Sequence, residues 1–252
     1  PLQSFGIYSL ASTMAALVYK LSSPIYNAVY PVFVILARNK DAIALGIIFR
    51  KSSQLMALSM TPFAIIVAFF SKEILYFWTQ SAQTADQGHW VLCALVLAAL
   101  MGATVWLPYG LQLAHQWVGL TLRLNAACVL VMGPLVYELT SKFGVIGGAI
   151  GWLVFNFAYV LLSGILSLKR LLPRELWGWF LRALVLPVFV SSLVCFVFSL
   201  LSSGRLSDLR GTSLLLVLAL IWLISSGLTL MVLPDVRKDA FSRLSKYRSA
   251  VP

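Results

Sequence analysis

The chain has 252 residues, of which 60% are hydrophobic and only 11% are charged, and its mean hydropathy is +0.92. These values exclude an ordinary soluble domain and indicate a protein that lives in a lipid bilayer. The net charge of +11 comes from basic residues that lie mostly between long apolar runs. Such residues favour contact with anionic headgroups of membrane lipids, and they do not indicate nucleic-acid binding.

Seven apolar segments are long enough to cross a bilayer, which takes roughly 20 helical residues per crossing. They cover residues 5–37, 53–70, 90–112, 121–139, 144–168, 183–201 and 212–233. The expected fold is therefore an all-α integral membrane protein with seven transmembrane helices. Residues 38–53 predict a short helix on the membrane surface, and residues 72–89 predict the longest loop at the other surface.

The first apolar segment has a charged residue, Lys20, near its middle. A charge at that depth costs on the order of 2.5 to 3.5 kcal/mol, so it usually faces a cavity or a partner. Helical spacing predicts a polar stripe on one face of this helix, formed by Ser9, Thr13, Lys20, Ser23 and Asn27. We expect this stripe to line a cavity and to bind substrate. The alternative is a structural lysine that extends to the membrane surface or pairs with an acid.

Three amide side chains, Gln112, Asn125 and Asn156, also lie within apolar segments. Hydrogen bonds between helices are the simplest role for such groups in a membrane. A secondary polar contact with a substrate is the alternative.

Glycines at positions 144, 147, 148 and 151 open the fifth apolar segment. Glycines spaced in this way let membrane helices approach closely, so we expect close helix packing here.

The sequence contains no pattern that indicates catalysis, a cofactor or a metal site. Cys93, Cys128 and Cys195 all fall within apolar segments, which is typical of buried thiols, and their spacing matches no zinc site. His89 and His115 are predicted to lie at opposite membrane surfaces. We therefore expect a protein that binds or moves its substrate without changing it.

The basic residues are distributed unequally between the two membrane surfaces, and the richer side is predicted to be cytoplasmic. The C-terminus is then cytoplasmic and residue 1 is outside. The richer side holds Arg38, Lys40, Arg50, Lys51, Arg123, Lys169, Arg170, Arg174, Arg182, Arg237, Lys238, Arg243, Lys246 and Arg248, and the poorer side holds Lys72, Lys142, Arg205 and Arg210.

Several segments resemble helices of polysaccharide flippases. The first has Gly6, Tyr8 and Ala11 near its start and Ala28 followed by Pro31 near its end. Further similar segments are residues 61–78, 107–116, 122–160 and 169–179. Together they resemble the second half of a Wzx-type O-antigen or exopolysaccharide flippase of the MATE-like superfamily, over essentially the whole chain.

The resemblance implies a transporter of roughly 12 to 14 helices in two lobes around a central cavity. Residues 1–168 would form five transmembrane helices of the C-terminal lobe, and residues 169–182 a cytoplasmic connection. Residues 183–233 would form a terminal helix pair, and residues 234–252 a basic cytoplasmic tail. The N-terminal lobe of the same protein, which is missing from this chain, would be a partner.

The resemblance also implies a function in the bacterial inner membrane, in the biosynthesis of lipopolysaccharide O-antigen or another surface polysaccharide. Such a protein is not an enzyme. It flips an undecaprenyl-diphosphate-linked oligosaccharide from the cytoplasmic to the periplasmic leaflet by alternating access. Lys20 would bind the diphosphate, and a polysaccharide polymerase is a possible partner.

Three alternatives stay open. A MATE-like exporter of small cationic molecules should have carboxylates in its cavity instead of a lysine. A membrane polysaccharide polymerase should have a large external loop with catalytic Arg, His or acidic residues. A seven-helix receptor fits the number of helices only.

Overall fold

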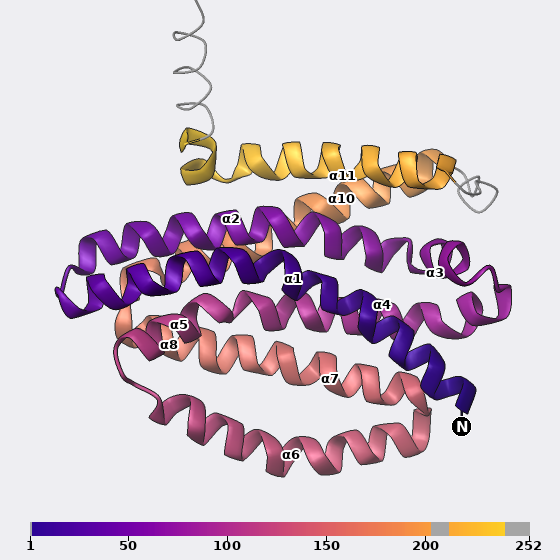
Figure 1. The fold of residues 1–252 in the computed structure, drawn as a ribbon, viewed down its shortest axis with the longest axis horizontal. Helices are drawn as coiled ribbons and strands as arrows, with labels where there is room; N and C mark the ends of the chain where they lie inside the picture. Colours follow the sequence, from indigo (N-terminus) through magenta and orange to yellow (C-terminus); the bar gives the residue numbers. More distant parts are fainter. Residues whose placement is uncertain (1, 203–211, 240–252) are drawn as a thin grey trace, which may run out of the picture.

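The computed structural model describes residues 2–202 and 212–239, and every regular element in these two ranges is helical. Six helical stretches there are long and apolar enough to cross a membrane. They cover Ala42–Phe69, Ala82–Ala114, Gly119–Phe143, Val145–Leu171, Pro173–Leu201 and Thr212–Val232. The helices run back and forth in an elongated bundle (Figure 1). The prediction of an all-α integral membrane protein is confirmed.

The first helix, α1 (Leu2–Arg38), is 37 residues long but is not among these six. Its sequence contains the polar stripe and two internal prolines, Pro24 and Pro31. It still packs along α2 (Ala42–Phe69) and across α4 (Ala82–Thr104) within the same bundle (Figure 1). The predicted seven spans therefore correspond to six strongly apolar ones plus α1.

The turn between α1 and α2 is shorter than the sequence indicated. The Asp41 carboxylate accepts a hydrogen bond of 2.9 Å from the backbone N–H of Ala44, which caps the start of α2. From there α2 continues without a break to Phe69. The predicted separate surface helix at residues 38–53 is wrong, since most of that segment is the first part of a membrane-length helix.

The predicted long loop at residues 72–89 is also wrong. Residues 71–79 form the short helix α3 (Ser71–Thr79), and α4 begins only three residues later. Gln80 adopts a left-handed conformation with φ of +52°, and the Ser81 hydroxyl accepts a hydrogen bond of 3.3 Å from the backbone N–H of Thr84. A serine cap of this kind starts a helix, so the polar residues that follow form the first turns of α4.

A break at Val105 separates α4 from α5 (Trp106–Ala114). Its cause is Pro108, because proline has no N–H to donate to the carbonyl of the residue four positions earlier, here Thr104. The break redirects the chain in the middle of a membrane-length stretch (Figure 1). It also opens space beside α1.

A tight hairpin joins α6 (Gly119–Phe143) to α7 (Val145–Tyr159). Gly144, in the turn, has φ of +62°, which is easy only for glycine. A Cβ at Gly147 would lie 1.9 Å from the backbone oxygen of Leu139 in α6. The predicted close packing at these glycines is confirmed for Gly147. The rest of α6, which precedes this hairpin in the chain, bows away from the bundle and is largely exposed (Figure 1).

The remaining described chain forms two further long stretches. A π-helical turn, η1 (Val160–Gly164), leads into α8 (Ile165–Leu171). Then follow the short helices η2 (Pro173–Glu175), α9 (Leu176–Trp179) and η3 (Phe180–Val185), which lead into α10 (Leu186–Ser202). Finally, α10 and α11 (Thr212–Val232) pack on each other and on α2 (Figure 1).

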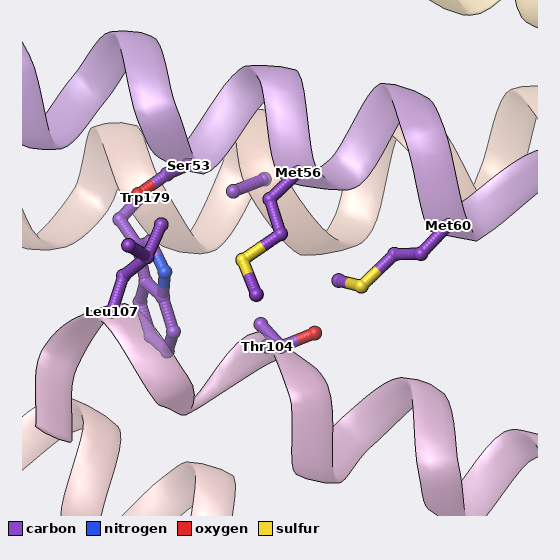
Figure 2. Close-up of a pocket in the computed structure, with 7 residues that line it drawn as sticks. Ser53, Met56, Met60, Thr104, Leu107 and Trp179 are labelled. Carbon is purple, nitrogen blue, oxygen red and sulfur yellow. The ribbon is translucent and has the colours of Figure 1, made fainter. Parts of the chain in front are cut away.

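The interior between α2, α4 and α5 is filled by large side chains. Met56 and Met60 point from α2 toward Thr104 and Leu107, and Trp179 closes one end (Figure 2). The space that these side chains leave is too small for a water molecule. This part of the described bundle is a packed core and not a binding site.

Candidate functional site

A cavity of about 270 Å³ lies where α1, α5, α6 and α7 meet, beside the break between α4 and α5. We call it the aromatic cavity. Its lining combines aromatic rings with amide and hydroxyl groups: Tyr19, Gly102, Val105, Trp106, Tyr109, Thr121, Asn125, Phe155, Asn156 and Tyr159. A pocket with several rings and a few polar groups is the usual form of a small-molecule site.

The rings on the α1 and α5 side hold one another in place. Tyr19 stacks on Trp106 with ring centroids 5.4 Å apart and 14° between the planes. Tyr26 meets the same indole edge-on at 5.7 Å and stacks on Tyr30 at 5.8 Å. Aromatic pairs in these geometries are attractive beyond the area they bury. Trp106 therefore has a fixed orientation beside the cavity.

Gly102 allows two polar groups of the cavity to approach α4 closely. A Cβ at this position would lie 2.6 Å from both the Asn156 Oδ1 atom and the Tyr19 hydroxyl oxygen. The Asn156 Nδ2 group donates a 2.9 Å hydrogen bond to the carbonyl of Trp152. Asn156 is buried, so the amide is held with its oxygen toward Gly102.

Next to the cavity lies a set of polar side chains, all buried except the half-buried Tyr159, which we call the glutamine cluster: Gln112, Thr121, Tyr159, Ser163 and Ser167. The Gln112 side chain, fully buried, donates to the hydroxyls of Ser163 at 3.2 Å and Ser167 at 2.5 Å. The Thr121 hydroxyl donates to Gln112 Oε1 at 2.5 Å.

The glutamine cluster connects directly to the aromatic cavity. The Tyr159 hydroxyl lies within hydrogen-bonding reach of Thr121 and Ser163, and both Thr121 and Tyr159 line the cavity. Ser163 belongs to the π-helical turn η1, a feature often found at functional sites. The expectation that Gln112 forms hydrogen bonds between helices is confirmed, since it joins α5 to α6, η1 and α8.

The structure places the predicted polar stripe beside the aromatic cavity and not within it. Ser9, Thr13, Lys20 and Asn27 are exposed, and Ser23 is half-buried. The Thr13 hydroxyl donates to the Ser9 carbonyl at 2.9 Å, and Asn27 Nδ2 donates to the Ser23 hydroxyl at 3.2 Å.

Lys20 is the charged member of the polar stripe. No hydrogen bond or ion pair joins it to another described residue. Its neighbour Tyr19 points into the aromatic cavity, and successive residues on a helix are about 100° apart. The stripe and the cavity therefore occupy adjoining faces of α1.

Of the amides predicted as secondary contacts, Asn125 and Asn156 line the aromatic cavity and Gln112 supports its wall. The aromatic residues Trp106, Tyr109 and Phe155 were not predicted as site residues. The spacing of Tyr19, Tyr26 and Tyr30 puts three rings on one face of α1, and that pattern could have indicated an aromatic surface. Nothing in the sequence placed α5 and α7 against it.

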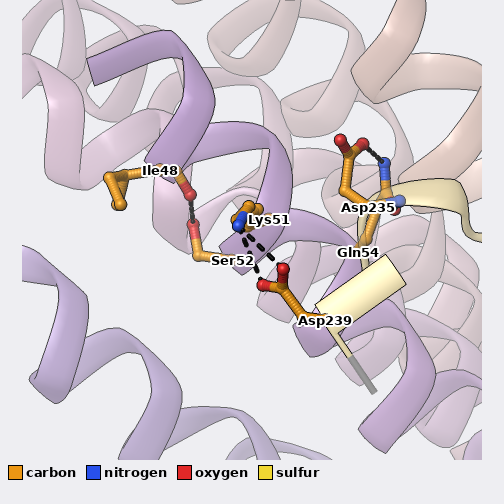
Figure 3. A network of polar contacts seen from close by, with 6 residues as sticks. All are labelled: Ile48, Lys51, Ser52, Gln54, Asp235 and Asp239. Carbon is orange, nitrogen blue, oxygen red and sulfur yellow. Dashed lines mark hydrogen bonds and ion pairs between the residues drawn. The ribbon is translucent and has the colours of Figure 1, made fainter. Parts of the chain in front are cut away.

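A separate polar network attaches the segment after α11 to α2 (Figure 3). Lys51 Nζ lies 3.0 and 2.9 Å from the two carboxylate oxygens of Asp239. Gln54 Nε2 donates to Asp235 Oδ2 at 2.6 Å, and Gln54 Oε1 accepts from the Asp235 backbone N–H at 3.1 Å. We call these four residues the terminal clamp. None of them lines the aromatic cavity, so we assign them a structural role.

The chemistry available in the aromatic cavity is stacking and hydrogen bonding. In residues 2–202 and 212–239, no group of three or more His, Cys, Asp or Glu side chains could hold a metal ion. Cys93, Cys128 and Cys195 are free thiols. Rings with adjacent amides and hydroxyls suit a ligand that has both apolar faces and hydroxyl edges.

Comparison with known proteins found no matching family model, no matching curated protein and no matching solved structure.

Proposed function

We propose that this chain is part of a transporter that flips an undecaprenyl-diphosphate-linked oligosaccharide across the bacterial inner membrane. The transport would occur by alternating access, during synthesis of a surface polysaccharide such as O-antigen. The observation that carries the proposal is the aromatic cavity between membrane-length helices. A sugar ring has an apolar C–H face that packs on aromatic rings and hydroxyls that pair with amides, and the cavity offers both.

The polar stripe extends this argument to the lipid-linked end of the substrate. Lys20 is exposed on a membrane-length helix and has no ion-pair partner among the described residues. An unpaired ammonium at that depth is costly unless it meets an anion. A diphosphate would supply one through charge-assisted hydrogen bonds. An N-terminal lobe of the same protein would then form the opposite wall.

The composition of the cavity also favours a glycan over a cationic drug. Its lining contains amides, hydroxyls and rings but no Asp or Glu. An exporter of small cations needs a carboxylate to balance the charge of its cargo. We propose a transport role, in which no bond of the substrate is broken, and a polysaccharide polymerase as a candidate partner.

We propose that the end of the bundle with the α1–α2 turn, α8 and the C-terminal end of α11 is cytoplasmic (Figure 1). Arg38, Lys40, Arg170, Arg174 and Arg237 fall on the segments at this end, in accord with the positive-inside rule. Five further members of the uneven charge distribution, Arg205, Arg210, Arg243, Lys246 and Arg248, lie outside the described residues, as does most of the expected tail.

Single cysteines test this orientation after Cys93, Cys128 and Cys195 are replaced by serine. Lys40→Cys and Arg174→Cys should resist a membrane-impermeant thiol reagent in intact cells, and Gln83→Cys should react. All three positions are exposed, so protection reports the membrane side and not burial. The reverse labelling pattern would overturn the orientation.

The function itself is tested by substituting Lys20 in the full-length protein. Lys20→Ala should remove surface polysaccharide while the protein stays in the membrane at its normal level, because the diphosphate loses its cation. Lys72→Ala is the matched control, since Lys72 is exposed and paired with Asp86 at 2.6 Å. Normal polysaccharide in the Lys20→Ala strain would remove Lys20 from the mechanism.

A further inference from the structure

A second cavity, separate from the aromatic one, lies between the connection from α5 to α6 and the end of α8. It has a volume of about 300 Å³ and is lined by Trp117, Leu120, Leu166, Lys169 and Arg170. We call it the basic groove. The α6 stretch begins at Gly119 and the α7–α8 stretch ends at Leu171. The groove is therefore at a membrane surface, where lipid headgroups lie.

Two cations stand beside the apolar walls of this groove. Lys169 and Arg170 are both exposed, and neither forms an ion pair with another described residue. No acidic residue lines the groove. Two positive charges at one rim without a counter-charge favour an anionic ligand.

The Arg170 side chain is already oriented by an aromatic contact. Its guanidinium carbon lies 4.3 Å from the centroid of a Trp117 ring. A guanidinium stacked on a ring keeps its N–H groups available at the edge of its plane, where a phosphate can accept from them. Arg170 is thus placed for phosphate binding before any ligand arrives.

The walls indicate which kind of phosphate fits. Leu120 is half-buried and Leu166 is 41% exposed, so an apolar surface continues from the cations toward the membrane interior. A free phosphate ion has no apolar part that could pack on that surface, whereas a phospholipid has an acyl chain that can. Basic pockets at the cytoplasmic surface of membrane helices are known to hold anionic headgroups.

We propose that the basic groove binds one anionic phospholipid of the surrounding bilayer. Its phosphate pairs with Lys169 and Arg170, and an acyl chain lies along Leu120 and Leu166. The site is independent of the glycan proposal, since none of its residues lines the aromatic cavity.

The test is lipid binding to the purified protein in detergent, followed by native mass spectrometry. The probes are dioleoylphosphatidylglycerol, which is anionic, dioleoylphosphatidylcholine, which is zwitterionic, and inorganic phosphate. We expect the anionic lipid to bind at least about fivefold more tightly than the zwitterionic one. Lys169→Gln combined with Arg170→Gln should remove this preference.

Two further variants separate the groove from general surface charge. Arg174→Gln removes a nearby exposed cation that does not line the groove, and it should leave the preference intact. Arg170→Lys keeps the charge and should retain part of the preference. Melting temperatures without added lipid should differ little between the variants, because the substituted side chains are exposed and only Arg170 loses a contact, the one with the Trp117 ring.

Three results would overturn the proposal. The first is an unchanged preference in the double variant. The second is an equal loss in Arg174→Gln, which would indicate diffuse electrostatic attraction. The third is displacement of the anionic lipid by an equal concentration of inorganic phosphate, which would indicate a free-anion site.

Discussion

Tyr19 of α1 stacks on Trp106 of α5 with only 14° between the ring planes. This contact joins the longest described helix to the short helix that follows the proline-induced break. It also places both rings in the wall of the aromatic cavity. The same pair therefore connects the packing of the bundle to the site that we propose binds the glycan.

Trp106→Ala should impair both stability and function. The substitution removes the ring contacts with Tyr19 and Tyr26, and because Trp106 is half-buried we expect a loss of about 1–3 kcal/mol in the free energy of unfolding. Surface polysaccharide should fall sharply in cells that carry the variant full-length protein. Trp106→Phe keeps an aromatic face, so it should retain most of the activity. Equal activity of Trp106→Ala and the wild type, at equal protein levels, would contradict the role of the cavity.

Gly102→Ala should close part of the cavity. The new methyl group would lie 2.6 Å from both Asn156 Oδ1 and the Tyr19 hydroxyl, so one of them must move. We expect about 1–3 kcal/mol of destabilisation and reduced transport.

Gly133→Ala, in α6, is the control for this substitution. A Cβ there meets no atom within 4 Å, and alanine is the better helix former by about 1 kcal/mol. The midpoint of thermal unfolding should fall for Gly102→Ala and stay the same or rise for Gly133→Ala. An equal change in both would show that the close approach at Gly102 is unimportant.

Gln112→Ala should destabilise the helical bundle because it removes the central side chain of the glutamine cluster. Three buried hydroxyls, of Thr121, Ser163 and Ser167, lose a partner, and buried unpaired polar groups cost about 1–3 kcal/mol. Thermal unfolding of purified protein measures the loss. Gln83→Ala, at an exposed position of α4, is the comparison and should be neutral. A neutral Gln112→Ala would mean that water replaces the lost hydrogen bonds at no cost.

The two pairs of the terminal clamp should differ in strength. The Lys51 and Asp239 side chains are 40% and 50% exposed, so Lys51→Ala should cost only about 0.2–1 kcal/mol. Gln54 is only 2% exposed, and Gln54→Ala should cost about 1–3 kcal/mol because Asp235 loses both a donor and an acceptor. Free energies of unfolding for the two variants provide the comparison. A larger loss of unfolding free energy in Lys51→Ala than in Gln54→Ala would contradict this ranking of the two pairs.

The sequence predicted the membrane fold well because apolar runs of membrane length are a local signal. It misplaced the start of α2, since Arg50 and Lys51 were interpreted as the end of the membrane segment. In the structure those cations face Glu175 at 3.5 Å and Asp239 at 2.9 Å, partners that are far away in sequence. Such pairings depend on tertiary packing, so the local pattern does not contain them.

The candidate site was predicted in part for the same reason. Asn125 and Asn156 were identified because an amide within an apolar run is conspicuous in the sequence. Aromatic residues such as Trp106 do not stand out in the sequence in the same way, since aromatic residues are common in membrane helices. Their convergence with Tyr19 requires the break at Val105 and the close approach at Gly102, and both are properties of the folded chain.

The central claim, that this chain belongs to a flippase for lipid-linked glycans, is tested most directly in proteoliposomes. The full-length protein is reconstituted with an undecaprenyl-diphosphate-linked oligosaccharide, and a membrane-impermeant glycosidase reports how much of it reaches the outer leaflet. We predict rapid exchange between leaflets with the wild-type protein and much slower exchange with Asn156→Leu, whose amide lies in the cavity wall. Exchange by the wild-type protein no faster than in protein-free liposomes would contradict the claim.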